Sequence, residues 1–206
     1  MYICLEGIKG AGKTATYAIV KSTLEELHIP FATICPTKPI SGFDLRENLN
    51  SKLELLRNST LWARWIYSHR SNLSAKRALR EKKSLILGDR SKLTSYVVRR
   101  MQGKSWDESV TIIDRIEKYI PIPDIVIYFN IDPAIAYERV KNRNDKFKIR
   151  KDETRDALIR SRDLYEELKN SNIVDKLNGI RWIELDGLSS PVYNAGYIMD
   201  IILNHK

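Results

Sequence analysis

Glycines, a lysine and a threonine near the amino terminus carry the clearest chemical signal in this chain. Gly7, Gly12, Lys13 and Thr14 match the pattern G-x-x-x-x-G-K-[ST]. Such glycines let successive backbone N–H groups turn inward around a polyphosphate, and the helix that follows adds the positive end of its dipole. We expect Lys13 to reach the β- and γ-phosphates of ATP, and the Thr14 hydroxyl to hold Mg²⁺.

The flanking sequence supplies the setting that this loop requires. Residues 2–5 form an apolar run typical of a buried strand, and residues 14–27 show the spacing of an amphipathic helix. A glycine-rich turn without a ligand is the alternative, but it gives no reason for the lysine and threonine after the last glycine. The chain is therefore expected to bind a nucleoside triphosphate.

A second pair of charged residues follows another apolar strand. Residues 84–87 read as a strand, and Asp89 and Arg90 come after it. A carboxylate at this place can order Mg²⁺ through water, and a guanidinium can clamp phosphate oxygens. The alternatives are an aspartate that caps the next turn and an arginine in a surface ion pair. We predict that Asp89 serves the metal and that Arg90 binds phosphate.

A basic stretch between two predicted helices is the third candidate. It runs over about residues 143–152 and contains few apolar side chains. A solvated charge run is one interpretation. The other is a short lid that folds over the phosphates, excludes water and stabilises the charge that develops during phosphoryl transfer. On this second interpretation Arg143 and Arg150 are catalytic candidates, because a guanidinium holds phosphoryl oxygens bidentately.

The elements that must position these residues alternate along the chain. The five predicted strands cover residues 2–5, 31–35, 84–87, 124–131 and 180–185. Helical spacing covers residues 14–27, 43–57, 60–82, 94–101, 106–119, 133–142, 154–170 and 191–203. This alternation is typical of a parallel sheet covered by helices on both faces. We therefore predict one α/β domain over residues 1–206, a three-layer sandwich of the P-loop NTPase type with a short basic lid.

In such sheets ligands bind at the carboxyl ends of the strands. The glycine loop and the pair Asp89–Arg90 both fall at such ends, so we expect them to converge on one site. The residues predicted to bind the donor nucleotide are Gly7, Lys9, Gly10, Ala11, Gly12, Lys13, Thr14, Ala15 and Arg143.

Composition limits the kinds of partner. The net charge of +9 suits a polyanionic ligand such as a nucleotide or a nucleic acid, yet no nucleic-acid-binding motif accompanies it. No apolar run is long enough to span a membrane. Cys4 and Cys35 lie in apolar runs without metal-ligand spacing, which favours thiols in a reducing, cytoplasmic compartment. A small-molecule nucleotide is the expected partner.

Over most of its length the chain resembles thymidylate kinase and the related nucleoside and nucleotide kinases. LEGIKGAGKT is similar to the opening motif of that family, ILGDR to its Asp-Arg element, and PDIVIYFNIDPAIAYERVKNR to its fourth strand and following helix. YSHR, which ends at Arg70, resembles the segment whose arginine touches the thymine base. The resemblance implies that Lys13, Thr14 and Asp89 serve ATP–Mg²⁺, that Arg90 holds the phosphate of the acceptor, and that Arg70 meets its base.

The resemblance carries further implications for catalysis and assembly. Arg143 would meet the adenine or the phosphates, and Arg150 would act from the lid, as in the bacterial-type arrangement with a glycine at position 10. The family is typically homodimeric. The residues expected to bind the acceptor are Lys38, Arg70, Arg90 and Tyr96.

The acceptor side departs from the family pattern, whereas the ATP side matches it. Lys9 stands where an acidic residue is usual near the acceptor sugar, and no glutamate follows Lys38. Ser91 replaces the usual tyrosine, and Tyr96 is offset from the expected aromatic residue. A deoxynucleotide other than dTMP, or a modified one, is therefore also compatible with the sequence.

The acceptor can be a monophosphate or a nucleoside. A hydroxyl acceptor needs a general base, but the second strand is followed by no carboxylate before Asp44. A phosphate acceptor needs only positioning, and the positive charges of Lys9 and Lys38 suit it. We therefore predict γ-phosphoryl transfer from ATP to a nucleoside monophosphate, most simply dTMP. A deoxynucleoside kinase is the alternative, because Asp89-Arg90-Ser91 resembles the Glu-Arg-Ser element of such kinases. A nucleic-acid-binding ATPase is the third hypothesis.

Overall fold

The computed structural model of the protein describes residues 1–36, 60–143, 151–170 and 175–204. Five strands form one parallel sheet in the order β2-β3-β1-β4-β5. The strands are β1 (Tyr2–Glu6), β2 (Phe31–Ile34), β3 (Leu85–Asp89), β4 (Ile125–Asn130) and β5 (Arg181–Asp186). All five predicted strands are confirmed, and their ends lie within two residues of the predicted ones.

The helices of the described residues also follow the predicted alternation. They are α1 (Lys13–Glu26), α4 (Thr60–Arg80), α5 (Lys92–Met101), α6 (Trp106–Ile116), α7 (Pro133–Arg143), α8 (Arg155–Asn170) and α9 (Pro191–Asn204). Two short 3₁₀ turns, η1 (Lys151–Glu153) and η2 (Asp175–Leu177), precede α8 and β5. The helix predicted over residues 43–57 and most of the predicted lid lie outside the described residues.

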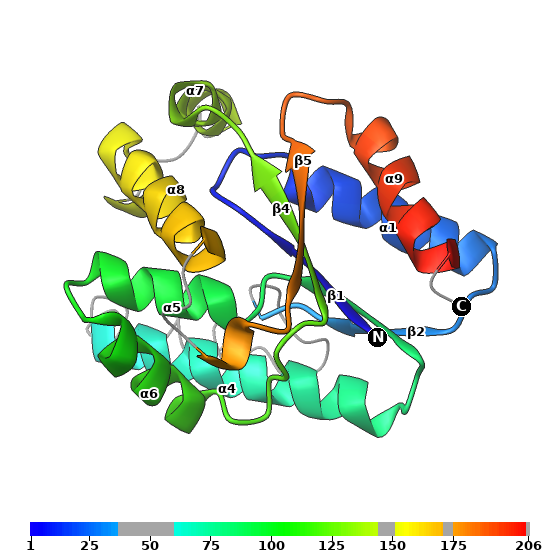
Figure 1. Ribbon diagram of the computed structural model, residues 1–206, viewed down its shortest axis with the longest axis horizontal. Helices are drawn as coiled ribbons and strands as arrows, with labels where there is room; N and C mark the ends of the chain where they lie inside the picture. The colour runs from blue at the N-terminus through cyan, green and yellow to red at the C-terminus, as the bar shows by residue number, and fades with distance from the viewer. Residues whose placement is uncertain (37–59, 144–150, 171–174, 205–206) are drawn as a thin grey trace, which may run out of the picture.

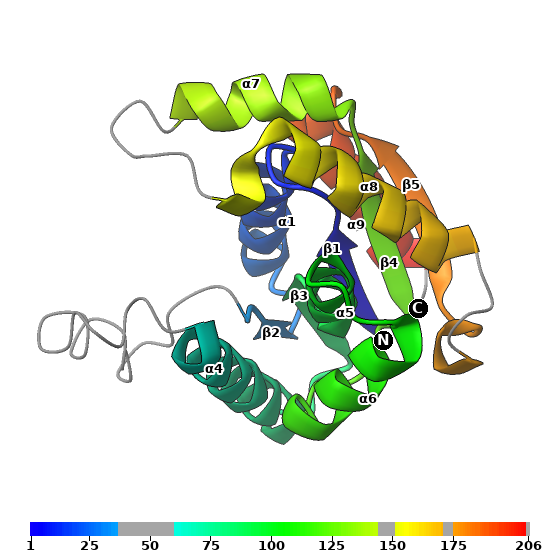
Figure 2. The same ribbon diagram turned by 90° about the vertical axis from the view of Figure 1, so that its left-hand side faces the viewer.

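The helices sandwich the sheet, as predicted. Helices α1 and α9 pack against each other on one face, whereas α4, α5 and α8 lie on the other (Figures 1 and 2). Helix α6 packs on α5, and α7 lies beyond the carboxyl end of β4. With both faces covered, β1 is buried along its whole length, which explains its unbroken apolar run before Glu6. None of the described helices combines the length and apolarity needed to span a membrane.

The order of the strands creates a crevice between β1 and β3. The chain leaves β1 towards β2 on one side, and leaves β3 towards β4 on the other side. Two adjacent strands whose connections run in opposite directions leave the space above their carboxyl ends open, and ligands bind there in such sheets. The glycine loop follows β1 and Asp89 ends β3, so the topology brings both candidate motifs to one point.

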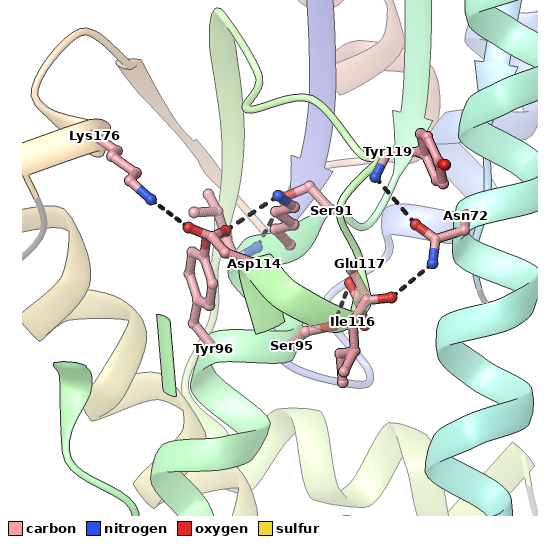
Figure 3. Close-up of polar contacts among 11 residues, drawn as sticks. Asn72, Ser91, Ser95, Tyr96, Asp114, Ile116, Glu117, Tyr119 and Lys176 are labelled. Carbon is pink, nitrogen blue, oxygen red and sulfur yellow. Dashed lines mark hydrogen bonds and ion pairs between the residues drawn. The ribbon is translucent and has the colours of Figure 1, made fainter. Parts of the chain in front are cut away.

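Polar contacts join α5 to its neighbours beneath this crevice. The Asp114 carboxylate on α6 accepts hydrogen bonds from Lys92 Nζ at 3.1 Å and from the Tyr96 hydroxyl at 2.8 Å, and Lys176 of η2 pairs with its other oxygen (Figure 3). Asn72 of α4 adds a second bridge, because its side chain bonds the backbone of both Ile116 and Tyr119. These contacts join α4, α5, α6 and η2 into one block.

A buried carboxyl group completes the block. Glu117 is 1 % exposed, and the Ser95 hydroxyl lies 2.9 and 3.1 Å from its two oxygens (Figure 3). Burial raises the pKa of Glu117 to about 7, although the Ser95 hydrogen bond and the charges of Lys92 and Arg99 oppose the shift. Glu117 therefore takes up its proton near neutral pH.

This shift makes stability depend on pH in a predictable direction. Because the pKa of Glu117 is about 7 in the folded chain and that of an ordinary glutamate is 4.5, its contribution to stability is present below pH 4.5 and is lost as the pH rises through 7. Glu117→Gln keeps the shape and cannot ionise. Urea denaturation should show that the substitution benefits stability more at pH 8 than at pH 5, by about 2 kcal/mol.

Glu138→Gln, on the exposed part of α7, serves as the control and should show no such difference between the two pH values. A Glu117→Gln effect that is equal at pH 5 and pH 8 would contradict the raised pKa.

Candidate active site

The glycine loop adopts a backbone that fits tightly against its neighbours. Gly7 and Gly10 have φ angles of 132° and 84°, in the region that side chains disfavour. A Cβ atom on Gly7 would lie 2.7 Å from the carbonyl oxygen of Phe129, and one on Gly10 would lie 2.4 Å from that of Ala136. The loop is therefore held between β4 and α7, with its shape fixed before any ligand arrives.

The loop leads into α1 without a side-chain cap. Gly12, at φ 90°, is the residue before the helix and provides no side-chain cap. The backbone N–H groups of the first turn and the positive end of the helix dipole suit an anion. Thr14 and Ala15 are exposed at this end, so the Thr14 hydroxyl is open to a ligand.

Lys13 lies folded into the loop. It is 5 % exposed, and its Nζ donates to the carbonyl oxygen of Ile8 at 2.6 Å. Burial and then the charge of Arg90 lower the pKa of the Lys13 ammonium, which is about 7 although Asp89 and Glu6 oppose the shift. Arg143 also acts on Lys13, so the structure brings these predicted site residues within electrostatic reach of one another.

The carboxyl end of β3 places Asp89 and Arg90 beside the loop. Asp89 pairs in register with Leu5 and is 4 % exposed. The backbone N–H of Arg90 donates to the carbonyl oxygen of Leu5 at 3.1 Å. The helix cap that a turn-capping Asp89 would provide comes instead from Ser91, whose hydroxyl accepts from the N–H of Leu93. The metal role of Asp89 therefore stays a prediction.

Glu6 is a buried carboxylate that the motif search missed. It ends β1, is 0 % exposed, and accepts hydrogen bonds from Ser91, Thr94 and Tyr165. The available signal was a carboxylate at the end of an otherwise apolar strand, directly before the glycine loop. Such a group needs several donors when buried, and the three partners supply them.

The Lys9 ammonium pairs with two carboxylates, which does not support the acceptor role predicted for its charge. Its Nζ lies 2.7 Å from an Asp152 oxygen and 3.1 Å from a Glu153 oxygen, both on η1. Two carboxylates thus offset the ammonium, and the argument that Lys9 favours a phosphate-bearing acceptor loses its support. The backbone of Lys9 remains part of the predicted phosphate loop.

A hydrogen bond joins helix α7 to the glycine loop. Arg139 of this helix was not singled out in the sequence analysis. Its Nη1 donates to the carbonyl oxygen of Gly187 at 2.7 Å and to that of Gly10 at 3.3 Å. It joins the glycine loop to the segment after β5. Arg143 ends the same helix one turn further on and is exposed, as a residue that closes on a ligand should be.

Arg70 lies on the face of α4 that covers β2. The Ser74 hydroxyl on this helix accepts a hydrogen bond from the backbone N–H of Cys35, just beyond β2. Arg70 comes one helical turn earlier, which carries it past the carboxyl edge of the sheet. It is 9 % exposed. Its predicted contact with the acceptor is compatible with this place.

Tyr96 is the residue whose placement departs from the prediction. It is 0 % exposed, packs in the core, and donates its hydroxyl to Asp114 on α6. Because its polar tip is engaged beneath the crevice, a direct substrate contact is not supported. Lys38 and Arg150 lie outside the described residues, so their roles stay predictions.

The donor set suits a hard cation that keeps most of its water. Among the described residues, no three His, Cys, Asp or Glu side chains gather into a metal site. Mg²⁺ needs only one or two protein oxygens beside those of phosphates and water. Thr14 at the helix start and Asp89 at the end of β3 are such oxygens, so the site fits magnesium held chiefly by the nucleotide.

Comparison with protein families gives a match over most of the chain. The family model described as thymidylate kinase matches residues 5–181. A thymidylate kinase of Colwellia psychrerythraea is 31 % identical over 176 residues, which cover 81 % of this chain and 80 % of that protein. A thymidylate kinase of Leptospira borgpetersenii is 29 % identical and covers 70 % of each.

Comparison with solved structures gives the same architecture. Deoxyadenosine kinase from M. mycoides, solved with dCMP and dCDP, superposes with a TM-score of 0.62 over 99 % of this chain and 100 % of that one. The same kinase with bound dATP gives a TM-score of 0.60. At 18 % and 20 % identity these likenesses establish a shared fold of the P-loop NTPase type and nothing about the substrate.

The contact between Gly10 and α7 leads to a stability prediction with a matched control. Gly10 and Gly12 both have positive φ, but only at Gly10 would a Cβ meet the backbone, because nothing lies within 4 Å of a Cβ on Gly12. Gly12→Ala should cost about 1 kcal/mol of folding free energy from backbone strain. Gly10→Ala should cost about 3 kcal/mol because overpacking adds to that strain. Urea denaturation measures both, and equal losses would show that α7 yields.

The lowered pKa of Lys13 predicts that nucleotide binding takes up a proton. At pH 8 an ammonium with a pKa of about 7 is mostly neutral, and the phosphates of ATP would restore its charge. Calorimetry of ATP binding in buffers of different ionisation enthalpy should report uptake of nearly one proton at pH 8. Lys13→Arg, which stays charged, should abolish this uptake, and an unchanged value in that variant would refute the assignment to Lys13.

Proposed function

The chain belongs to the thymidylate kinase family, and we propose that it transfers the γ-phosphoryl group of ATP to the phosphate of dTMP, giving dTDP and ADP. The observation that supports the proposal is the meeting, at one switch point, of two groups that the sequence predicts to bind phosphate. The glycine loop follows β1 and leads to Lys13, and Arg90 follows β3 directly beside it. One cation therefore serves each of the two nucleotides.

The donor would bind on the loop side. The first N–H groups of α1 would surround the β- and γ-phosphates, and Lys13 would leave the Ile8 carbonyl to meet them. Arg143 at the end of α7 would contact the adenine or the phosphates. Mg²⁺, held by Thr14 and through water by Asp89, would neutralise phosphate charge when bound.

The acceptor would bind on the β3 side. Arg90 would hold its phosphate, and Arg70 on α4 would reach its base. The acceptor phosphate is already an anion, so the transfer needs positioning and charge stabilisation but no general base. The γ-phosphoryl group would pass in line to the acceptor oxygen without a covalent enzyme intermediate. Arg150, from the lid predicted over residues 143–152, would stabilise the charge that develops.

Two further proposals concern the setting of the reaction. The homodimer rests on the family resemblance and would be tested by the mass of the protein in solution. A reducing compartment such as the cytoplasm rests on Cys4 and Cys35, which are both thiols in the described residues.

Phosphorylation of a deoxynucleoside is the alternative that the fold allows. It would need a general base beyond β2, and residues 35 and 36, which follow that strand, are a cysteine and a proline. The likeness to deoxyadenosine kinase is one of fold, so it does not favour a nucleoside acceptor. A nucleic-acid-binding ATPase draws on the net charge of +9 alone.

A panel of acceptors tests the proposal directly. ADP release from ATP–Mg²⁺ should rise with dTMP, and less with dUMP, dCMP, dGMP, dAMP and UMP, because Arg70 and its neighbours read one base. Thymidine and deoxycytidine should give no turnover. Turnover with a nucleoside only would establish the alternative, and stimulation by DNA without any monophosphate effect would establish the ATPase.

Substitution of the two phosphate-binding cations should separate the two nucleotides. Lys13→Ala should remove most turnover while thermal unfolding stays cooperative, because it deletes the charge on the donor phosphates. Arg90→Ala should impair kcat or the KM for dTMP far more than the binding of ATP. An active Lys13→Ala enzyme would overturn the kinase mechanism, and equal losses for both nucleotides would overturn the role of Arg90.

A further inference from the structure

We propose that Thr94 and Tyr165 are positioning residues which, through the buried Glu6, set the direction of the Arg90 guanidinium. The inference rests on the proposed function, in which Arg90 holds the phosphate of the acceptor. It deepens that function by assigning three side chains to the acceptor half of the site. Two of them lie on helices, Thr94 on α5 and Tyr165 on α8. The third, Glu6, ends β1 and accepts a hydrogen bond from each of the other two.

Arg90 occupies a strained backbone conformation that its surroundings must maintain. Its φ angle is 74°, in the left-handed region that a bulky side chain enters at a cost of about 1–2 kcal/mol. Two hydrogen bonds to β1 hold the backbone at Arg90 and at the residue after it. The N–H of Arg90 donates to Leu5, and the next N–H, that of Ser91, donates to a Glu6 oxygen at 2.7 Å. This backbone conformation sets the direction in which the Arg90 side chain leaves the chain, and the guanidinium reaches the Thr94 hydroxyl.

Glu6 anchors this arrangement with both carboxylate oxygens. Oε1 accepts from the N–H and the hydroxyl of Ser91, each at 2.7 Å. Oε2 accepts from the Thr94 hydroxyl at 2.6 Å and from the Tyr165 hydroxyl at 2.9 Å. Ser91, Thr94 and Tyr165 thus surround the fully buried carboxylate with N–H and O–H donors, and the Cys4 thiol lies 3.9 Å from Oε1. The group is therefore fixed in position by two helices and one turn.

The single proton of the Thr94 hydroxyl makes this anchor directional. When that proton points to Glu6, the lone pairs of the oxygen remain free to accept, and Arg90 Nη1 lies 3.2 Å from this oxygen. Arg90 can then donate to Thr94 without competition for the same proton. A carboxylate on one side thus turns the threonine into an acceptor on the other, and the acceptor holds one arm of the guanidinium.

Tyr165 reinforces the same orientation from α8. Its hydroxyl lies 2.8 Å from the Thr94 oxygen and 2.9 Å from Glu6 Oε2, so it can donate to either. The side chain is 1 % exposed, and its ring lies 5.6 Å from that of Tyr128. Burial and the charge of Glu6 raise the pKa of the tyrosine, so its hydroxyl keeps its proton. Loss of this hydroxyl would leave Thr94 and Glu6 with one partner fewer.

The inference predicts an effect on the acceptor alone. The guanidinium would keep its charge without Thr94 or Tyr165 but would lose its fixed direction, so its bidentate grip on phosphate would weaken. Lys13 and the first turn of α1 bind the donor phosphates by other contacts. Fold stability would fall with any buried hydroxyl, so stability alone does not distinguish a positioning role from packing.

Paired variants make the distinction. Thr94→Val removes the hydroxyl at constant volume, and Thr94→Ser restores it. Tyr165→Phe is compared with Tyr128→Phe, which deletes a hydroxyl from another buried tyrosine that has no bond to Glu6. We expect Thr94→Val and Tyr165→Phe each to raise the KM for dTMP about tenfold, the effect of losing one hydrogen bond near a charge, with the KM for ATP unchanged. Thr94→Ser and Tyr128→Phe should match the wild type.

A double-mutant cycle tests whether the effect passes through Arg90. Calorimetry of dTMP binding in the Arg90→Ala background should show that Tyr165→Phe weakens affinity no further. An equal weakening with and without Arg90 would overturn the inference, as would an unchanged KM for dTMP in both Thr94→Val and Tyr165→Phe. If Thr94→Val fails to fold, Tyr165→Phe decides alone. A wild type that phosphorylates no monophosphate would overturn the proposed function itself, which is a separate outcome.

Discussion

The hydrogen-bonded pairing of β1 with β3 is the constraint on which the site depends. Leu5, the next-to-last residue of β1, lies opposite Asp89, the last residue of β3, so the carboxyl ends of the two strands meet at the same edge of the sheet. This register puts the Glu6 carboxylate against Ser91 and puts Arg90 beside the glycine loop. A slip of one residue would turn every side chain of β3 to the other face and would separate these groups.

The crevice gathers positive charge before any nucleotide arrives. Burial lowers the pKa of Lys13, and the charges of Arg90 and Arg143 act on it in the same direction. The neighbouring Asp89 and Glu6 compensate only in part. A site with such unbalanced repulsion stores electrostatic energy that phosphates can release, because they supply the missing negative charge in a place of low dielectric. Selectivity for polyanions follows from the same imbalance.

Local patterns in the sequence predicted the sheet, the helices and the two phosphate-binding motifs, because apolar periodicity and the glycine pattern depend on neighbouring residues. Contacts between distant residues were not predictable in this way. The ion pairs of Lys9 with η1 join residues far apart in the chain, and nothing in the loop motif predicts them. The direction of Tyr96 depends on where α6 packs, and Glu6 gains its partners only once α5 and α8 are in place.

The central position of β1 also shapes how the chain folds as it is made. Tyr2 pairs with Ile86, and Ile3 pairs with Ile125, so β1 leaves the ribosome well before either of its neighbours. At about 5–20 residues per second, roughly ten seconds pass between the synthesis of β1 and that of its second partner, β4. During that time an apolar strand with two open edges is exposed, which is the kind of segment that chaperones retain. The nucleotide-binding centre is thereby the part of the molecule most dependent on assistance during synthesis.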